Sequence, residues 1–193
     1  MALGGFVRDD RDISITAIAE NGRRFPIDKL VAHQDGGTLH LAISVFLYSE
    51  RGVLLQQRAA DKYHSGGLWA NSVCSHPDWG EDIADCARRR CREELHIEAP
   101  LEALGVIDYR ADVGGGLTEH ERAHIFAGRV PVEAAEISPN PVEAAATRWI
   151  DRETLHTEMA EHPDRFTPWF RQYMSRDDPA LRAMRELVWS RIP

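Results

Sequence analysis

The sequence predicts an α/β or α+β sandwich, in which mixed strands enclose one central helix and further helices follow late in the chain. Three observations lead to this expectation. Short apolar and β-branched runs, separated by turn residues, fill the first half of the chain. Residues 82–95 then change to a helical period, and helix-start signals recur after residue 150.

The first half of the chain is expected to form strands at residues 13–19, 23–27, 39–48, 53–57 and 68–73. Asn21-Gly22 supplies a tight turn between the first two, and Asp28 can cap a short helix through Ala32. Residues 49–52 turn the chain, and the polar stretch 59–67 is typical of a loop. In 82–95, apolar residues recur every four positions and form one stripe on a helix: Ile83, Ala87, Cys91 and Leu95.

The second half is expected to add strands at residues 101–109 and 122–130, with a run of glycines at 114–116 between them. Asp151 can cap a helix that reaches Ala160. Asp178 followed by Pro179 signals a last helix, because proline is favoured at the first helical position. The apolar residues of that helix are Leu181, Met184, Leu187 and Val188.

Composition and charge limit the possible functions. The 193 residues are 43% hydrophobic and 28% charged, which fits one globular domain and excludes wholesale disorder. No apolar run reaches the roughly 18 residues of a spanning helix, and residues 1–12 show no secretory signal. A formal charge of −8 disfavours binding to nucleic-acid backbone. Three cysteines suit a reducing compartment, so a cytoplasmic protein is expected.

A set of histidines and glutamates could hold a metal ion. His33, His40 and His76 lie outside any long apolar helix, and Glu119 and Glu121 stand two residues apart. On a strand, residues two apart point to the same face, so both carboxylates can address one site. Three imidazoles and two carboxylates suit Mn²⁺, Zn²⁺ or Mg²⁺. The alternative is that nine histidines scatter over surface and core without forming a site.

Cys74 is the cysteine with a chemical context. It ends a predicted strand, precedes His76 by two residues and lies just upstream of the central helix. That position suits a nucleophile or an acid/base thiol, and the alternative is a buried cysteine that packs as a small hydrophobe. Cys86 and Cys91 fall within the central helix, where packing is the expected role.

Residues 75–97 resemble the Nudix box, G-x5-E-x7-R-E-U-x-E-E-x-G-U, where U is a bulky apolar residue. Ser75 stands at the first glycine position, and the other matches are Glu81, Arg89, Cys91, Glu93, Glu94 and Ile97. Two departures from the pattern matter: Arg90 replaces the first helix glutamate, and His96 replaces the second glycine. In Nudix hydrolases the box loads metals that activate water on a diphosphate. A cation at Arg90 removes one ligand and repels Mg²⁺, which argues against that hydrolysis.

Further motifs surround this segment. They are Ala32-His33 with Leu39-His40, the run 69–77 (WANSVCSHP), Arg89-Arg90-Cys91-Arg92 with Glu94, Glu119-His120-Glu121 and Thr167-Pro168-Trp169. Together, over about residues 10–172, they resemble the type 1 isopentenyl-diphosphate isomerases, Nudix-fold enzymes whose box is altered in this way. The resemblance implies one Nudix-fold domain over residues 1–193, with a core at about 38–155 and a C-terminal helical extension at about 156–193.

The resemblance also implies roles for single residues. Cys74 and Glu121 correspond to the catalytic cysteine and glutamate, Tyr109 to a tyrosine beside that glutamate, and Trp169 to an aromatic facing the isoprenoid tail. The family's metal site, for Mn²⁺, Zn²⁺ or Mg²⁺, falls on His33, His40, His76, Glu119 and Glu121. A Mg²⁺ that accompanies the substrate diphosphate falls on Glu94 and the carbonyl of Cys74. The diphosphate-binding cations are Lys29, Arg58, Lys62 and Arg90. Without the resemblance, Arg58 and Lys62 are ordinary loop charges, and Trp169 is a packing aromatic beside Phe166 and Phe170.

In this family a 1,3 proton shift through a tertiary carbocation interconverts isopentenyl and dimethylallyl diphosphate, the precursors of isoprenoids. Two rival functions remain open. A Nudix hydrolase of nucleoside diphosphates requires the helix carboxylate that Arg90 replaces, and a catalytically silent metal-binding module predicts that Cys74→Ala leaves function intact. The expected partner is a small isoprenoid diphosphate. The chain is expected to be a monomer or weak homo-oligomer without nucleic-acid or membrane partners.

Overall fold

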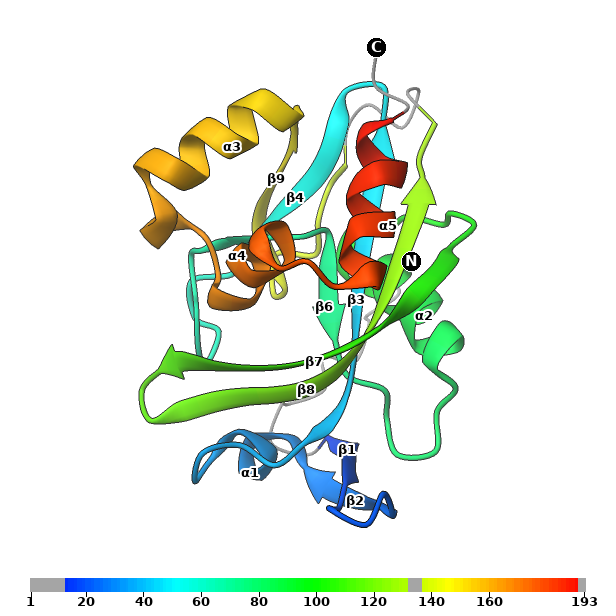
Figure 1. The fold of residues 1–193 in the computed structure, drawn as a ribbon, viewed down its shortest axis with the longest axis vertical. Helices are drawn as coiled ribbons and strands as arrows, with labels where there is room; N and C mark the ends of the chain where they lie inside the picture. The colour runs from blue at the N-terminus through cyan, green and yellow to red at the C-terminus, as the bar shows by residue number, and fades with distance from the viewer. Residues whose placement is uncertain (1–12, 132–136, 191–193) are drawn as a thin grey trace, which may run out of the picture.

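A mixed β-sheet organises residues 13–131 and 137–190, the part of the chain that this computed structural model describes (Figure 1). The strands are β1 (Ser14–Ile18), β2 (Arg24–Asp28), β3 (His40–Ser49), β4 (Gly52–Arg58), β5 (Trp69–Ala70), β6 (Val73–Ser75), β7 (Glu102–Gly114), β8 (Leu117–Arg129) and β9 (Ala144–Ile150). The helices are α1 (Lys29–His33), α2 (Ile83–Leu95), α3 (Arg152–Glu161), α4 (Pro168–Ser175) and α5 (Pro179–Trp189), with a 3-10 turn, η2, at Pro163–Arg165. The predicted mixed α+β architecture is confirmed.

Strand β3 is the centre of the sheet, and all ten of its residues are buried. It pairs antiparallel with β1, β4 and β6 and parallel with β8. The parallel register places His40 opposite Glu121. The antiparallel register with β6 places Ser44 opposite Cys74. Strand β3 therefore aligns His40, Cys74 and Glu121, three of the site residues expected from the sequence.

The sheet divides where β3 and β4 diverge. These strands pair at Tyr48–Val53 and Ser49–Gly52, and β4 then continues with β5 and β9 while β3 continues with β6 and β8. The Ser72 hydroxyl bridges the two halves: its oxygen accepts from the Leu47 amide at 2.8 Å and it donates to the Leu54 carbonyl at 2.7 Å.

This division corrects one prediction. The single strand expected at 68–73 is wrong, because the chain leaves β5, crosses between the half-sheets and enters β6. The polar side chains of Asn71 and Ser72 bind backbone groups of neighbouring strands at the crossing, and Asn71 Nδ2 donates to the Val45 carbonyl at 3.1 Å. Polar side chains that bond to backbone in this way compete with the regular ladder.

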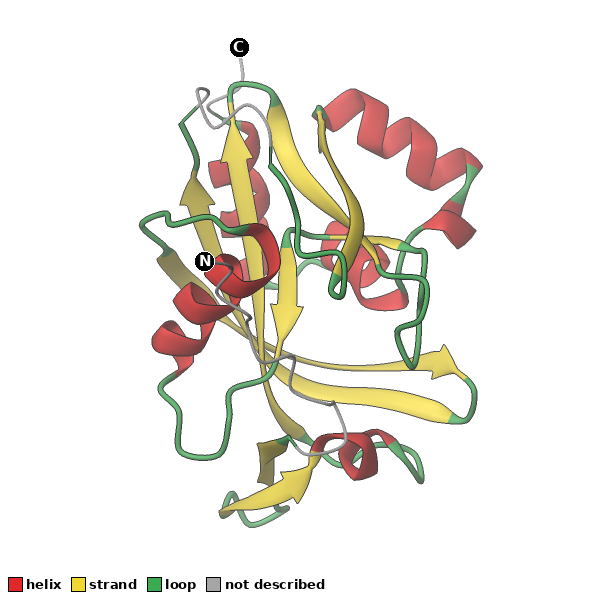
Figure 2. Cartoon of the chain, turned by 180° about the vertical axis from the view of Figure 1, so that it is seen from behind, coloured by secondary structure: helices red, strands yellow, loops and turns green. Residues whose placement is uncertain are grey.

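Helices cover both faces of the sheet. Helix α2 packs on one face, where Cys86, Ala87, Cys91 and Leu95 join the apolar side chains of β3. Helices α4 and α5 pack on the other, with Trp169 and Leu181 in the second core. Figure 1 shows α4 and α5 in front of the sheet, and Figure 2, from behind, shows α2. The packing role expected for Cys86 and Cys91 is confirmed by their complete or nearly complete burial.

Most local predictions agree with the structure. Asp28 and Asp151 cap α1 and α3 as predicted, each accepting a backbone N–H group of the first turn. The ends predicted for the β7–β8 hairpin are wrong, because both strands continue to the glycine turn at 114–116. Glu119 and Glu121 occupy inward positions of β8, so that segment lacks the apolar alternation by which a half-buried strand is recognised. Helix α4 was not predicted.

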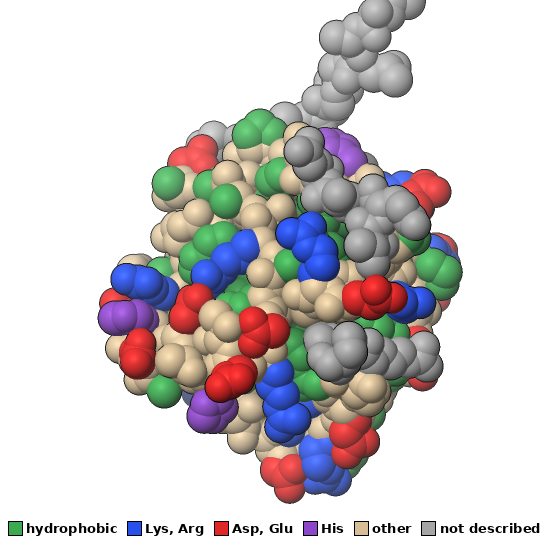
Figure 3. Space-filling view, turned by 90° about the horizontal axis from the view of Figure 1, so that it is seen from above, with side chains coloured by type: hydrophobic (Ala, Val, Ile, Leu, Met, Phe, Trp, Pro, Cys, Tyr) green, Lys and Arg blue, Asp and Glu red, His purple; other side chains and the backbone are tan. Residues whose placement is uncertain are grey.

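The described part of the chain has no helix both long and apolar enough to cross a membrane. Residues 1–12, inspected above for a secretory signal, lie outside the described residues, as do 132–136 and 191–193. The face seen in Figure 3 carries acidic and basic side chains interspersed with one another.

Candidate active site

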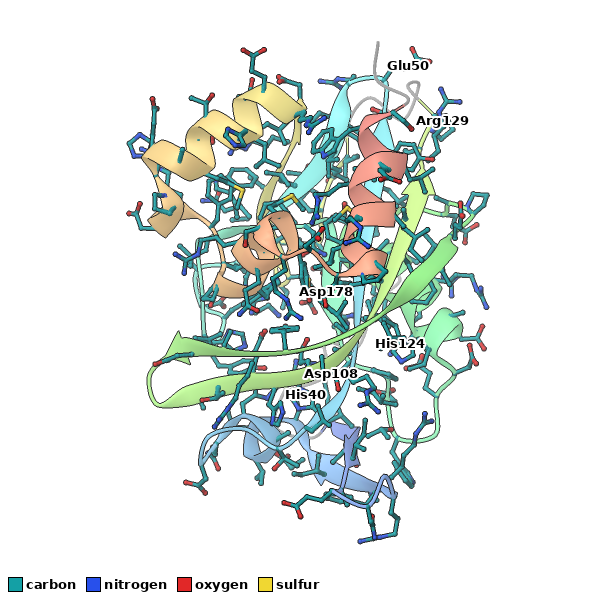
Figure 4. The ribbon with its side chains drawn as sticks, viewed as in Figure 1. His40, Glu50, Asp108, His124, Arg129 and Asp178 are labelled. Carbon is teal, nitrogen blue, oxygen red and sulfur yellow. The ribbon has the colours of Figure 1, made fainter. Side chains whose placement is uncertain are left out.

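Most of the expected site residues line one pocket where the sheet divides, and His33 and His40 lie next to its lining residues His76 and Glu121. Its walls come from the loop after β4, from β6, from the β7–β8 hairpin, from α2 and from the start of α4. The residues that line it include Lys29, Arg58, Lys62, His64, Cys74, His76, Arg90, Glu94, Tyr109, Glu119, Glu121, Glu143 and Trp169. Figure 4 shows His40 between α1 and the β7–β8 hairpin.

Four of the expected metal donors converge. Donor atoms of His33, His40, His76 and Glu121 all lie within 4.8 Å of one another. The Oε1 atom of Glu121 is 3.0 Å from Nε2 of His76 and 3.7 Å from Nε2 of His40. Because α1, β3, the segment after β6 and β8 each contribute one residue, this group depends on the whole fold.

Backbone carbonyls fix the orientation of two of these histidines. Nδ1 of His33 donates to the Lys29 carbonyl, and Nδ1 of His40 donates to the Thr38 carbonyl, each at 2.7 Å. A carbonyl can only accept, so Nδ1 carries the hydrogen and Nε2 presents a lone pair. Both Nε2 atoms are buried without a hydrogen-bond partner in the described structure. A ring nitrogen held this way is the usual arrangement of a metal-binding histidine.

Burial also keeps the imidazoles of His33 and His76 neutral. Desolvation, reinforced by His40, lowers the pKa of His33 to about 4. Desolvation lowers the pKa of His76 to about 3, although contact with Glu121 opposes the shift. Neutral imidazole is the form that binds a metal ion.

Glu119 faces a second group, which contains His33 and His64. Its Oε1 atom is 3.6 Å from Nε2 of His64. The Tyr109 hydroxyl contacts Oε2 of Glu119 at 2.5 Å and Oε2 of Glu121 at 2.6 Å, and so links the two groups. Burial and the charge of Glu121 raise the pKa of Glu119 well above its usual range. Burial opposes ionisation of Glu121 as well, but the hydrogen bond that Nε2 of His76 donates at 3.0 Å holds the pKa of Glu121 well below the usual range.

Cys74 carries a protonated thiol. Its Sγ donates to Oδ1 of Asn71 at 3.0 Å and lies 3.6 Å from the Ser44 hydroxyl, which in turn contacts the Tyr173 hydroxyl at 2.8 Å. Burial raises the pKa of Cys74 to about 12. At neutral pH the group is therefore a thiol with a proton, held in a defined direction.

The basic residues of the pocket are paired with groups of the chain itself. Lys62 contacts Glu143 at 2.6 Å, and Nη2 of Arg90 lies 2.8 Å from Glu94 and 3.1 Å from Glu143. Arg58 donates to the His64 carbonyl at 3.3 Å and lies 5.2 Å from the ring centroid of Trp169, and Lys29 lies 5.4 Å from the ring centroid of Tyr63.

The pocket residues that the sequence analysis missed include His64 and Glu143. His64 lies in the stretch 59–67, which was interpreted as a polar loop, and no spacing in that stretch distinguishes it. Glu143 is one glutamate of an acidic chain and belongs to no motif. Only the fold brings them to the pocket.

Known proteins match this sequence and this fold. A NUDIX domain model matches residues 38–170. Over 155 residues the chain is 52% identical to the isopentenyl-diphosphate Delta-isomerase of Cereibacter sphaeroides, covering 80% of this chain and 86% of that protein. This chain belongs to the isopentenyl-diphosphate Delta-isomerase family. The family member of Rhodobacter capsulatus is 47% identical over 152 residues, covering 78% of this chain and 85% of its own.

Solved structures share the fold of this isomerase-family chain. The protein DR0079 of Deinococcus radiodurans matches with a TM-score of 0.60 and 16% identity, over 77% of this chain and 90% of that one. A MutT protein of Methanosarcina mazei Go1 matches with a TM-score of 0.57 and 16% identity, over 77% and 95%. Identities this low establish the fold and nothing more.

The structure explains how this family member keeps the Nudix helix with an altered box. Glu81 holds Arg89 through two contacts of 2.7 and 2.6 Å and accepts from the Asp78 amide at 2.9 Å, so this pair fixes the turn before α2. His96 adopts the left-handed backbone, with φ of 55°, that the pattern's glycine would take. Its Nδ1 donates to the Ser138 carbonyl at 2.8 Å, a contact that glycine cannot make.

Proposed function

We propose that this chain interconverts isopentenyl and dimethylallyl diphosphate in the pocket described above, with Cys74 and Glu121 as the two acid/base groups. The supporting observation is that both side chains line one pocket from different strands. Their partners on β3, Ser44 and His40, are four residues apart. An even separation puts both side chains on the same face of the sheet.

The reaction requires one proton to be added and another removed. Addition to the terminal carbon of the alkene forms a C–H bond and leaves a tertiary carbocation, and loss of a proton from the carbon beside the diphosphate-bearing one forms the new double bond. Cys74 and Glu121 each exchange one of these protons. A thiol that retains its proton and a carboxylate that is ionised are complementary partners in such a shift.

The donor set around Glu121 fits a divalent ion. Unpartnered Nε2 atoms of His33 and His40, the neutral ring of His76 and the nearby Glu119 and Glu121 offer nitrogen and oxygen ligands without a thiolate. A bound ion would stabilise the Glu121 carboxylate and alter its proton affinity. Mn²⁺, Zn²⁺ and Mg²⁺ all accept this donor set.

The basic side chains of the pocket fit the diphosphate. They are Lys29, Arg58, Lys62 and Arg90. We assign the Mg²⁺ that accompanies the diphosphate to Glu94 and the Cys74 carbonyl, because Glu94 is a buried carboxylate beside the pocket. Trp169 supplies a π face for the carbocation. Water must be kept from that cation, and the burial of Trp169 and Tyr109 meets this need.

The test is incubation of metal-loaded protein with isopentenyl diphosphate, followed by measurement of acid-labile product, because an allylic diphosphate solvolyses readily. We expect turnover with Mg²⁺ and Mn²⁺ present, and near-complete loss in Cys74→Ala. Glu121→Gln should fold but turn over poorly, since it keeps its shape and loses its base. Absence of acid-labile product from the metal-loaded wild type would falsify the proposal, and phosphate release from nucleoside diphosphates would favour the hydrolase.

We place the enzyme in the cytoplasm, as a monomer or weak homo-oligomer whose partner is a small isoprenoid diphosphate rather than nucleic acid or membrane. Its three cysteines are free thiols, as is usual in a reducing compartment.

A further inference from the structure

Glu143 lines the pocket where the diphosphate would bind, and no motif assigns it a role. Its carboxylate contacts the Lys62 ammonium at 2.6 Å through Oε2 and the Arg90 guanidinium at 3.1 Å through Oε1. Each oxygen thus meets one of two basic groups, as the oxygens of a phosphate would. Burial opposes its ionisation, but Arg90 and Lys62 lower the pKa of Glu143 to about 2, so the group is an anion at neutral pH.

The backbone of Glu143 is fixed. Its amide donates to the Asn140 carbonyl at 2.9 Å, and its carbonyl accepts from the Ala59 amide at 3.0 Å. Asn140 is itself tied to the end of α2, where its amide donates to the Glu94 carbonyl at 2.8 Å. The carboxylate can therefore leave Lys62 and Arg90 by rotating its side chain, without any movement of the loop.

We propose that the Glu143 carboxylate holds the place of a phosphate group and is displaced when the diphosphate binds to Lys62 and Arg90. The inference rests on the proposed function, because it needs those two cations to contact the substrate. A pocket that gathers cations for a polyanion faces their mutual repulsion when the polyanion is absent. Glu143 removes that repulsion and competes with every incoming anion.

This role predicts that removing the charge of Glu143 increases the affinity for diphosphate, which a merely structural ion pair does not predict. If Glu143 competes with the ligand, Glu143→Gln tightens diphosphate binding, because Lys62 then loses the carboxylate it contacts and Arg90 loses one of three. If Glu143 instead helps to hold the Mg²⁺ that accompanies the diphosphate, the substitution weakens binding. If it only stabilises the fold, the melting temperature falls and the affinity stays the same.

The experiment measures calorimetric binding of inorganic diphosphate with Mg²⁺ to the metal-loaded full chain. We expect Glu143→Gln to bind about tenfold more tightly, the change that roughly 1.4 kcal/mol produces. The matched control is Glu93→Gln. Glu93 also contacts Arg90, at 2.9 Å, but its side chain is 45% exposed and does not line the pocket. The control removes the same charge and should change the affinity less than twofold.

A second readout is steady-state turnover. The KM for isopentenyl diphosphate should fall in Glu143→Gln, and dimethylallyl diphosphate should become a stronger product inhibitor by a similar factor. Glu143→Asp keeps the charge on a shorter side chain and should give an intermediate affinity.

The outcomes separate this inference from the function on which it rests. Suppose that the wild type binds diphosphate and isomerises the substrate, but Glu143→Gln binds diphosphate no more tightly than the wild type. That result overturns the inference and leaves the proposed function intact. A wild type that neither binds diphosphate nor isomerises overturns both.

Discussion

Replacing Tyr109 by phenylalanine tests how the two glutamates share the site. The hydroxyl lies 2.5 Å from Glu119 and 2.6 Å from Glu121, and burial, with the charge of Glu119, raises the pKa of Tyr109 well above its ordinary value. A phenol carries one hydrogen, so it can donate to only one of these carboxyl groups, and a protonated Glu119 can supply the other contact. The substitution leaves two buried carboxyl groups without their shared partner.

The size of the effect follows from these contacts. A hydrogen bond to a charged group contributes about 1.5–3 kcal/mol. At about 1.4 kcal/mol per tenfold change, Tyr109→Phe should lower kcat by roughly 10- to 150-fold. Loss of a donor destabilises the ionised form of Glu121, so its pKa rises and the acidic limb of the pH–rate profile moves to higher pH. The aromatic contact with Tyr173, at 5.6 Å between ring centroids, is retained.

The assay is formation of acid-labile product across pH, together with urea unfolding of both proteins. The matched control is Tyr173→Phe, which removes a buried hydroxyl that contacts Ser44 at 2.8 Å and no carboxylate in the described structure. That control should lose stability without moving the acidic limb. Wild-type kcat and an unmoved acidic limb in Tyr109→Phe would refute the reasoning.

Three further predictions concern the fold, the metal group and pH. Ser72→Ala removes the hydroxyl partner of the Leu47 amide and the Leu54 carbonyl, so it should lower the free energy of unfolding by about 2–4 kcal/mol in urea titration. A loss below about 0.5 kcal/mol, which is typical of a surface substitution, would contradict the bridging role. His64→Ala should weaken Mn²⁺ affinity roughly 10- to 100-fold in calorimetry, because His64 lies beside Glu119, whereas His156→Ala on the exposed face of α3 should not. The pKa of Glu143 falls from 4.5 in isolation to about 2 in the fold, so its stabilising contribution is complete above about pH 4.5 and is lost as pH falls toward 2. The decline in unfolding free energy over that range should be shallower in Glu143→Gln, and an identical decline would count against the ion pairs.

Periodic segments were predictable from sequence because burial imposes the period. Helix α2 is the clearest case: Asp82 caps it, and Ala87, Cys91 and Leu95 face the sheet as their spacing requires. The chain departs from such patterns where polar residues serve the pocket. Asn71 and Ser72 interrupt a strand, and Glu119 and Glu121 occupy inward positions of β8.

The site was predictable only as far as its motifs extend. The motif residues His33, His40, His76 and Glu121 could be named, and the structure brings them together; their roles stay predictions. His64 and Glu143 reach the pocket through the loop after β4 and the turn before β9. Loop positions carry no periodic signal, so only the folded arrangement reveals them. Helix α4 has eight residues, too few for a clear periodic stripe.

The environment of Cys74 has a consequence for the durability of the enzyme. With its pKa near 12, the sulfur is almost entirely a thiol at pH 7. The thiolate is the form that attacks peroxides and alkylating reagents, so a sulfur that stays protonated reacts slowly with them. The same burial that preserves a transferable hydrogen therefore shields this sulfur from oxidative damage, so inactivation by hydrogen peroxide should be slow.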